Sequence, residues 1–165
     1  MSFHSINEID KFSFEDCVIH KIGMEEGGLC LELEAVIVRP NNSQNTNYTE
    51  SYAGPLTAHL TDGRILQVIK EGYTYLDAND KPLEEVPDTE LSEEEVASLL
   101  KTCEGNYWYG MEQKSFEDGI YTYVCGLEMQ PEEVYDTSAA DTYRFIISFT
   151  KAEFVWQYYL NRVQR

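Results

Sequence analysis

Alternating apolar and polar positions run through much of the first half of the chain, which is the pattern of a half-buried β-strand. Residues 29–38 alternate leucine and other apolar side chains with polar ones, which predicts a strand with one dry face and one wet face. Residues 11–22 also predict a strand. Gly27 and Gly28 lie between the two segments and can adopt the positive φ of a tight turn. The pattern therefore predicts an antiparallel hairpin.

A second hairpin is predicted further along the chain. Residues 56–60 and 65–69 are alternating runs, and the Asp62-Gly63 pair between them is a strong signal for a hairpin turn. Further segments rich in aromatic and β-branched residues predict more strands. These are residues 72–76, 107–111, 120–129 and 143–149.

One helix is predicted over about residues 92–103. Ser92 and Glu95 have the spacing of a capping box, in which each side chain accepts a hydrogen bond from the other residue's backbone. Apolar residues then recur at i, i+3, i+4 and i+7 from Val96, which gives the helix one apolar stripe. Gly105 is positioned to end the helix.

The C-terminal segment supports two interpretations. Thr150 and Glu153 repeat the capping-box spacing, and Arg162 would suit the end of a helix, so we expect a helix over about residues 151–162. The alternative is a strand, because residues 154–159 are mostly aromatic and β-branched.

Taken together, these elements predict an α+β fold in a single β-rich domain that covers residues 1–165. We expect an antiparallel sheet of about seven strands, bent or two-layered, packed by the two helices. Residues 40–51 are polar and rich in asparagine, so we expect a mobile loop there. Residues 13–16 recur as residues 115–118, each time before a strand, and we interpret this as local similarity rather than a duplication.

The charge narrows the possible partners. Thirty acidic and twelve basic residues give the 165-residue chain a formal net charge of −18. Such a field repels phosphate groups, so we expect no nucleic-acid partner and no docking on an anionic membrane. A basic protein is the partner that this charge would attract, although a merely solvated acidic surface explains it too. Of the acids in residues 84–95, those in the first helical turn complement the helix dipole. The candidate binding residues are the remaining four: Glu84, Glu85, Asp88 and Glu90.

The lack of a recognisable targeting signal and the spacing of the cysteines predict a cytoplasmic location. Residues 1–11 have neither a basic region nor an apolar core, and no apolar run approaches the roughly 18 residues of a membrane span. The four cysteines are widely separated and contain no C-x-x-C pair. We therefore expect buried thiols rather than disulfides.

The sequence contains no recognisable catalytic, nucleotide or metal motif. His4, His20 and His59 are far apart and fit no metal-ligand spacing, so we expect no metal site, no cofactor and no catalytic residue. A group of aromatic residues, Tyr107, Trp108 and Tyr109, is a candidate binding cluster. The alternative is that these side chains belong to the core beside the helix.

Three classes of function remain. The first is a non-enzymatic cytoplasmic binding or regulatory protein, such as an acidic inhibitor or immunity-type protein for a basic partner. The second is a small-ligand-binding domain with an aromatic-lined cavity. The third is a hydrolase that uses carboxylates, although abundant acids make close pairs uninformative. The sequence indicates no oligomeric state and no particular partner.

Overall fold

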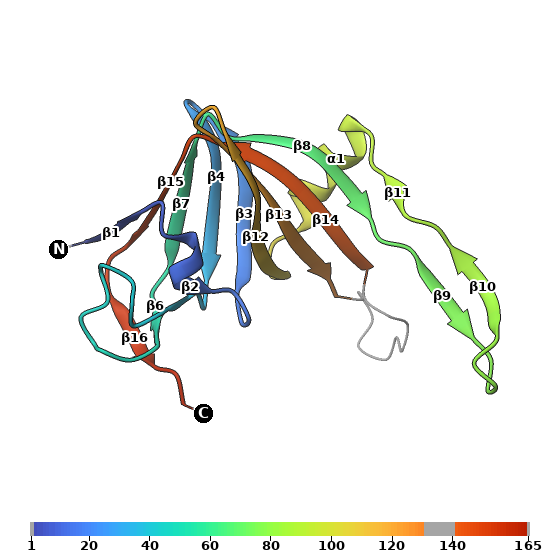
Figure 1. Ribbon diagram of the computed structural model, residues 1–165, viewed down its shortest axis with the longest axis horizontal. Helices are drawn as coiled ribbons and strands as arrows, with labels where there is room; N and C mark the ends of the chain where they lie inside the picture. The colour runs from blue at the N-terminus through green and yellow to red at the C-terminus, as the bar shows by residue number, and fades with distance from the viewer. Residues whose placement is uncertain (1, 131–140, 165) are drawn as a thin grey trace.

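The computed structural model describes residues 2–130 and 141–164, and it consists mainly of antiparallel β-sheet (Figure 1). The largest sheet of this described part has ten strands. Their spatial order is β1 (Phe3–Ile6), β15 (Lys151–Trp156), β7 (Leu56–Thr61), β4 (Gly28–Glu34), β3 (Val18–Glu25), β12 (Tyr107–Glu117), β13 (Ile120–Met129), β14 (Asp141–Phe149), β8 (Arg64–Lys70) and β11 (Thr89–Glu90).

Two smaller sheets and two helical segments complete the described part of the chain. The smaller sheets are β16 (Tyr159–Arg162), β6 (Ser51–Ala53), β5 (Ile37–Val38) and β2 (Phe12–Ser13), and the pair β9 (Tyr73–Leu76) and β10 (Pro82–Val86). The helical segments are α1 (Glu93–Thr102) and a short 3-10 helix (Ile9–Lys11). The α+β class with an antiparallel sheet is therefore confirmed, but the prediction of about seven strands was too low.

The ten-stranded sheet bends at a narrow seam between β3 and β12. These two strands share one residue pair in register, Val18 with Tyr107. Three backbone hydrogen bonds lie beside the pair: from Trp108 N–H to the Cys17 carbonyl at 3.1 Å, from Ile19 N–H to the Asn106 carbonyl at 2.8 Å, and from Gly105 N–H to the Ile19 carbonyl at 2.8 Å. Because so few bonds hold the seam, the five strands on either side of it can turn relative to one another.

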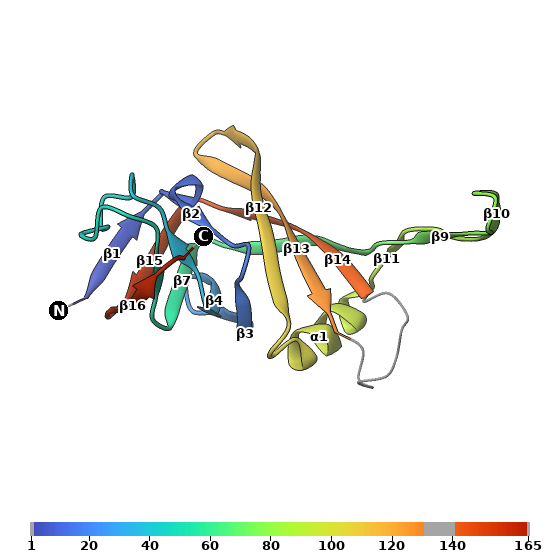
Figure 2. The same cartoon turned by 90° about the horizontal axis from the view of Figure 1, so that it is seen from below.

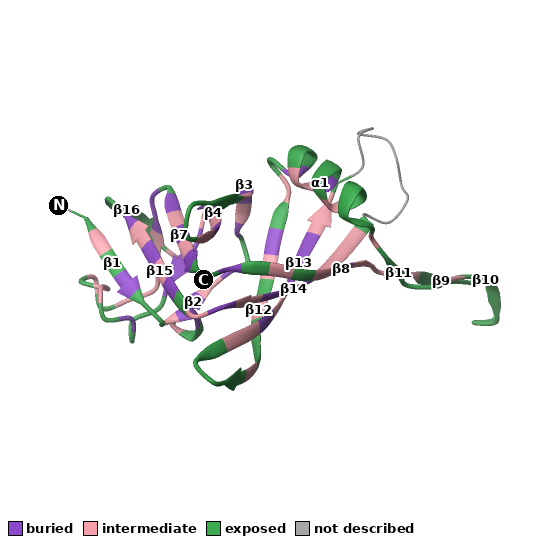
Figure 3. Cartoon of the chain, turned by 90° about the horizontal axis from the view of Figure 1, so that it is seen from above, coloured by how far each residue is buried: buried purple, intermediate pink, exposed green. Residues whose placement is uncertain are grey.

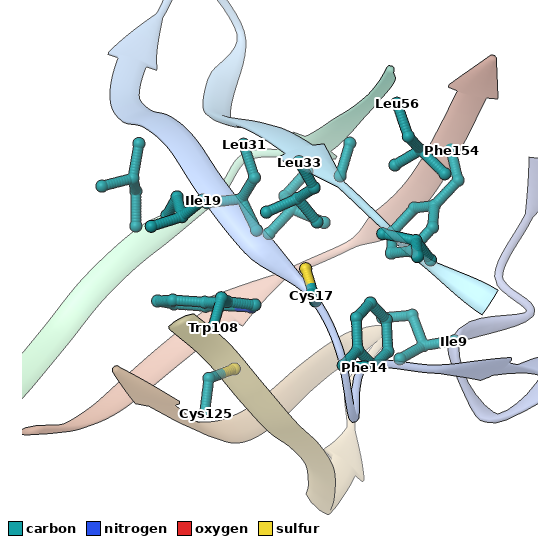
Figure 4. Close-up of a cluster of buried hydrophobic side chains, with 14 of the residues drawn as sticks. Ile9, Phe14, Cys17, Ile19, Leu31, Leu33, Leu56, Trp108, Cys125 and Phe154 are labelled. Carbon is teal, nitrogen blue, oxygen red and sulfur yellow. The ribbon is translucent and has the colours of Figure 1, made fainter. Parts of the chain in front are cut away.

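The hydrophobic core lies between the two halves of the bent sheet (Figure 4). Ile19 and Leu31 come from the half that contains β3 and β4, and Trp108 comes from β12 in the other half. The Trp108 ring packs edge-on against Phe145, with 5.3 Å between ring centroids. Colouring by burial shows that buried residues alternate with half-buried or exposed ones along the central strands (Figure 3).

The first predicted hairpin is present with different boundaries, and the second is wrong. β3 begins at Val18 rather than at residue 11, because residues 12–13 form β2 in a separate sheet. β4 ends at Glu34, where Ala35 has φ of 56° and breaks the alternation expected to residue 38. In the second, the chain does turn at Asp62-Gly63, but β7 pairs with β4 and β15, and β8 pairs with β14 and β11. The turn therefore carries the chain from one half of the bent sheet to the other instead of closing a hairpin.

The predicted helix is also confirmed. α1 has Ser92 as its N-cap, and the capping box is complete. Glu95 N–H donates to the Ser92 hydroxyl at 3.2 Å, and Ser92 N–H donates to the Glu95 carboxylate at 3.1 Å. Leu99 and Cys103 are the buried members of the apolar stripe. The first-turn carboxylates of α1 thus serve the helix itself.

The predicted C-terminal helix is wrong, because residues 151–162 contain strands β15 and β16. β15 pairs with β1 on one side and with β7 on the other, so its backbone groups are satisfied by neighbouring strands. Burial alternates along it, with Phe154 and Trp156 buried and Val155 half-buried. Thr150 does not cap a helix; its hydroxyl donates to the Thr61 carbonyl at 3.2 Å. Pairing with distant strands outweighs the local capping pattern here.

Residues 40–50 form the expected loop, since Ser51 already belongs to β6, and asparagine side chains organise its backbone. The Asn45 amide donates to the carbonyls of Val38 at 3.1 Å and Thr49 at 2.9 Å. The buried Asn42 amide donates to the Ser5 hydroxyl at 3.2 Å. The mobility of the loop stays a prediction.

The four cysteines are free, and Cys17, Cys103 and Cys125 are buried, as the sequence predicts, whereas Cys30 is half-buried. Burial raises the pKa of each of these three thiols. Among the described residues, no helix is both long and apolar enough to cross a membrane.

Candidate functional site

A two-stranded hairpin projects from one end of the molecule (Figures 1 and 2). β9 and β10 extend the ladder formed by β8 and β11, in which Thr89 pairs with Lys70 and Glu90 pairs with Ile69. We call residues 72–87 the arm. In the described part of the chain no third strand pairs with β9 or β10, so the arm presents a strand edge on both sides.

Large apolar side chains are exposed on the arm. Tyr73, Tyr75, Leu76 and Leu83 are 45–70% exposed. The Tyr73 and Tyr75 rings meet with their centroids 4.9 Å apart, and Glu84 lies directly opposite Tyr75 in the ladder. Because opposite residues in a ladder share a face, the two tyrosines and this carboxylate lie on the same side of the arm.

The arm and the residues that flank it are strongly acidic. Residues 71–90 contain a single basic residue, Lys81. The acidic residues in this range are Glu71, Asp77, Asp80, Glu84, Glu85, Asp88 and Glu90. Glu84 and Glu85 are both exposed on β10. The net negative charge therefore continues along the whole projection.

The base of the arm is closely packed. We call it the neck, and it is where Glu71, Gly72 and Asp88 meet Arg144. Gly72 lies so near β10 that a Cβ atom at this position would stand 1.9 Å from the Val86 carbonyl oxygen. The Gly72 N–H donates to the Asp88 carboxylate at 2.7 Å. Arg144 of β14 reaches Asp88 at 3.6 Å and Glu71 at 3.9 Å. These contacts attach both strands of the arm to the main sheet.

An isolated two-stranded hairpin is at best marginally stable in water, because it has little apolar area to bury. The arm beyond the neck has this composition, and its large apolar side chains are exposed. Exposed apolar side chains grouped on one segment typically mark a site that a partner covers. The same group would otherwise favour aggregation, and the surrounding carboxylates oppose it.

The structure separates the acidic residues proposed from the sequence. Glu84 and Glu85 lie on the arm, and Glu90 is exposed on β11 near the neck. Asp88 has a structural role, because its carboxylate holds Gly72 and Arg144. The two arm carboxylates are therefore the ones with the best access to a partner.

The aromatic cluster does not form one surface. Trp108 is 0% exposed, and its indole Nε1 has no hydrogen-bond partner in the described part of the chain. Tyr109 is half-buried, with its ring lying over Gly126 of β13, whereas Tyr107 is exposed. Side chains alternate between the two faces of β12, so neighbouring aromatics cannot share one face. Trp108 is a core residue, as the alternative interpretation held.

Sequence reasoning missed the apolar residues of the arm. The strand over residues 72–76 was predicted, but no strand was predicted over residues 82–86, and residues 84–86 were taken only as part of an acidic run. The turn at Asp77–Asp80, followed by Pro82 and alternating Leu83 and Glu84, is the signal that could have indicated a returning strand.

Two surface grooves bear on the small-ligand alternative. One has a volume of about 430 Å³ and is mainly apolar; Tyr52, Pro55, Tyr158 and Leu160 contribute to its lining. The other, of about 260 Å³, combines Tyr121 and Phe149 with the polar Asp10 and Gln113. Neither of these two grooves lies between the sheet and α1, where the sequence suggested a cavity. A groove of about 640 Å³ does lie there, between Ile22 of β3 and Leu100 of α1, but no tyrosine, tryptophan or phenylalanine lines it.

One carboxyl group with a shifted pKa, Glu8, has a structural role. Burial alone would raise the pKa of Glu8, but hydrogen bonds from Ser43 and Ser5 outweigh burial and lower it. Ser43 N–H donates to this carboxylate at 3.1 Å and the Ser5 hydroxyl at 2.8 Å. Glu8 thus ties the 40–50 loop to the start of the chain as an ionised group.

The chain was compared with models of protein families, with curated proteins and with solved structures. No family model matches the sequence, no curated protein matches it, and no solved structure matches the fold. The functional argument therefore depends on the geometry of the chain itself, and the arm is its most distinctive exposed feature.

Proposed function

We propose that this protein is a non-enzymatic binding protein that recognises a basic protein partner through the arm. The observation that carries the proposal is a projecting hairpin whose apolar side chains stand exposed among carboxylates. Interfaces typically combine a few aromatic or aliphatic anchors with a polar rim. Tyr73, Tyr75 and Leu83 have the character of anchors, and Glu84 and Glu85 have the character of a rim.

Charge supports a basic partner in particular. The formal net charge of −18 attracts a cationic surface over the distance of a Debye length, which is about 8 Å at physiological salt. Such steering raises association rates and lowers binding to other acidic proteins. The arm carries this charge furthest from the body, so it is the part that meets a partner first.

The shape of the arm suits recognition by an inhibitor or immunity-type protein. A projecting hairpin can enter a concave site, and its exposed strand edges can pair with a strand of the partner. The neck contacts of Gly72, Asp88 and Arg144 hold the arm in one direction before binding. Such preorganisation lowers the entropy lost on association.

The test compares two charge variants with the same net charge. Glu84→Gln/Glu85→Gln removes two carboxylates from the arm, and Glu112→Gln/Glu117→Gln removes two exposed carboxylates from β12. Wild type and both variants are immobilised at low salt to recover proteins from the source cells. A recovered basic protein is then purified and titrated against each form by calorimetry, at low and at high salt.

We expect the arm variant to weaken binding by tenfold or more, and the β12 variant to weaken it far less. Leu83→Ser should also weaken binding, whereas Leu66→Ser, at an exposed position on β8, should not. Equal effects of the two charge variants would show attraction to bulk charge only and would refute an arm site. Binding that does not weaken as salt rises would refute recognition of a basic surface.

A second candidate function is the binding of a small apolar ligand in the groove beside Tyr158 and Leu160. Its support is the mainly apolar lining of that groove and the exposure of both side chains. A neutral apolar dye such as Nile red tests it. Leu160→Asp should abolish an enhanced fluorescence that Leu66→Asp leaves intact, and equal fluorescence in both variants would contradict the proposal.

A further inference from the structure

The outer face of the sheet holds a cluster of metal-ligating side chains that is separate from the arm. We propose that Glu25, Cys30 and His59 form a binding site for Zn²⁺ or a similar divalent cation. Their ligand atoms, a carboxylate oxygen, Sγ and a ring nitrogen, all lie within 4.8 Å of one another. Thiolate, imidazole and carboxylate are the three side-chain ligand types that zinc uses in proteins.

Strand register brings these three residues together. Cys30 of β4 lies directly opposite His59 of β7, so both side chains point to the same face of the sheet. Glu25 is the last residue of β3, opposite Gly28 at the hairpin turn. From there its carboxylate approaches His59 Nδ1 to 2.8 Å and also hydrogen-bonds with the Cys30 thiol.

The distances suit a tetrahedral ion. With zinc–ligand bonds of about 2.0–2.3 Å, the ligand atoms of a tetrahedral site lie about 3.3–3.8 Å apart. The separations in this cluster are close to that range, since Glu25 Oε1 and His59 Nδ1 are 2.8 Å apart and no two of the three ligand atoms are more than 4.8 Å apart.

The surroundings leave space beside the cluster and supply negative charge. Gly23 of β3 lies opposite Cys30 on the other side of β4, and a Cβ atom there would meet nothing closer than the Lys21 side chain at 3.9 Å. The carboxylates of Glu25 and Glu32 are close enough to Cys30 to act on its charge. Such a concentration of negative charge attracts a cation.

Three protein ligands leave the fourth position of a tetrahedral ion to water or to an outside group. When the ion binds, the Cys30 thiol releases its proton to solvent, and the hydrogen bond between His59 and Glu25 is replaced by two bonds to the metal. Glu153 lies opposite His59 on β15, within the same row of the sheet, and adds negative charge to this face.

The test measures binding of Zn²⁺ against a chromogenic chelator, and then binding of Co²⁺ by its absorption spectrum. We expect one strongly bound Zn²⁺ per chain and a thiolate-to-cobalt charge-transfer band. Cys30→Ala, His59→Gln and Glu25→Gln should each weaken Zn²⁺ binding by tenfold or more. The matched control is His20→Gln. His20 also pairs with a carboxylate, Glu34 at 2.8 Å, but the neighbours that act on its charge are carboxylates and not a thiol.

A second measurement needs no variant. Zn²⁺ should protect Cys30 of the wild-type chain from alkylation, as read by peptide mass spectrometry. Absence of protection, or a cobalt spectrum without the charge-transfer band, would overturn the proposal. So would Zn²⁺ affinity lowered as much by His20→Gln as by His59→Gln, because acidic surface groups would then hold the ion. Glu84→Gln/Glu85→Gln should leave Zn²⁺ binding unchanged, so this site and the arm are tested independently.

Discussion

Replacing Phe154 by alanine tests the assignment of the C-terminal segment as strand β15. The Phe154 ring is buried and packs against Phe12 and Phe14, with ring centroids 4.7 Å and 6.2 Å away. Loss of a buried phenylalanine typically costs about 3–5 kcal/mol, which includes the cavity it leaves. Because two aromatic contacts are lost as well, we expect a cost near the middle of that range, about 4 kcal/mol.

Val155→Ala is the matched control, because Val155 is the next residue on β15 and points to the outer face of the sheet. Its side chain is half-buried, so we expect a cost of about 1 kcal/mol or less. The assay is urea unfolding followed by far-UV circular dichroism and by fluorescence of the buried Trp108 and Trp156. With a slope of about 2 kcal/mol per M of urea, Phe154→Ala should lower the midpoint by about 2 M.

The ratio of the unfolding free energies lost in Phe154→Ala and Val155→Ala decides whether residues 151–156 form a strand. A strand buries alternate residues, so the costs must differ several-fold between neighbouring positions. If Val155→Ala were as costly as Phe154→Ala, or if Phe154→Ala cost less than about 1 kcal/mol, the packing of β15 between β1 and β7 would be wrong.

Three further changes test separate features. Glu8→Gln should cost about 1–2 kcal/mol at pH 7 in urea unfolding, because Glu8 accepts hydrogen bonds as an anion. Its folded pKa is lowered, so this contribution is present above the unfolded pKa of about 4.5 and the difference from wild type should vanish as pH falls through the folded pKa. Ser92→Ala should cost about 1 kcal/mol by removing the cap of α1, and an unchanged midpoint would contradict the capping box. Gly72→Ala should open the neck, because its Cβ would meet the Val86 carbonyl. Limited proteolysis should then cut faster within residues 73–86 while the urea midpoint changes little; unchanged cleavage would contradict the close packing of the neck.

Local patterns predicted the elements that are stabilised locally. The Asp62-Gly63 turn and the Ser92 capping box depend on residues within a few positions of one another, and both are present, although the turn joins two strands that do not pair with each other. The 120–129 strand also has the predicted boundaries. The C-terminal segment failed because β15 is stabilised by β1 and β7, which no local pattern reveals.

For the candidate sites too, the sequence revealed local composition but not the contacts that depend on strand pairing. The acidic residues Glu84 and Glu85 were visible in composition, but their place on a projecting hairpin was not, because nothing in the acid run showed which strand it would pair with. The Glu25, Cys30 and His59 cluster has no motif, since its members are separated by up to 34 residues and meet only through register. Trp108 illustrates the converse, because aromatic character alone does not distinguish a buried side chain from a contact residue.

The position of β15 has a consequence for the order of folding. β1 comes first in the chain, yet its described partner in the sheet is β15. His4 therefore cannot form its backbone pairing until Val155 has been synthesised. During synthesis the first strand therefore emerges about 150 residues before its neighbour exists. We expect this half of the sheet to close last and slowly, with the exposed edge of β7 vulnerable to wrong pairing until the C-terminal strand arrives.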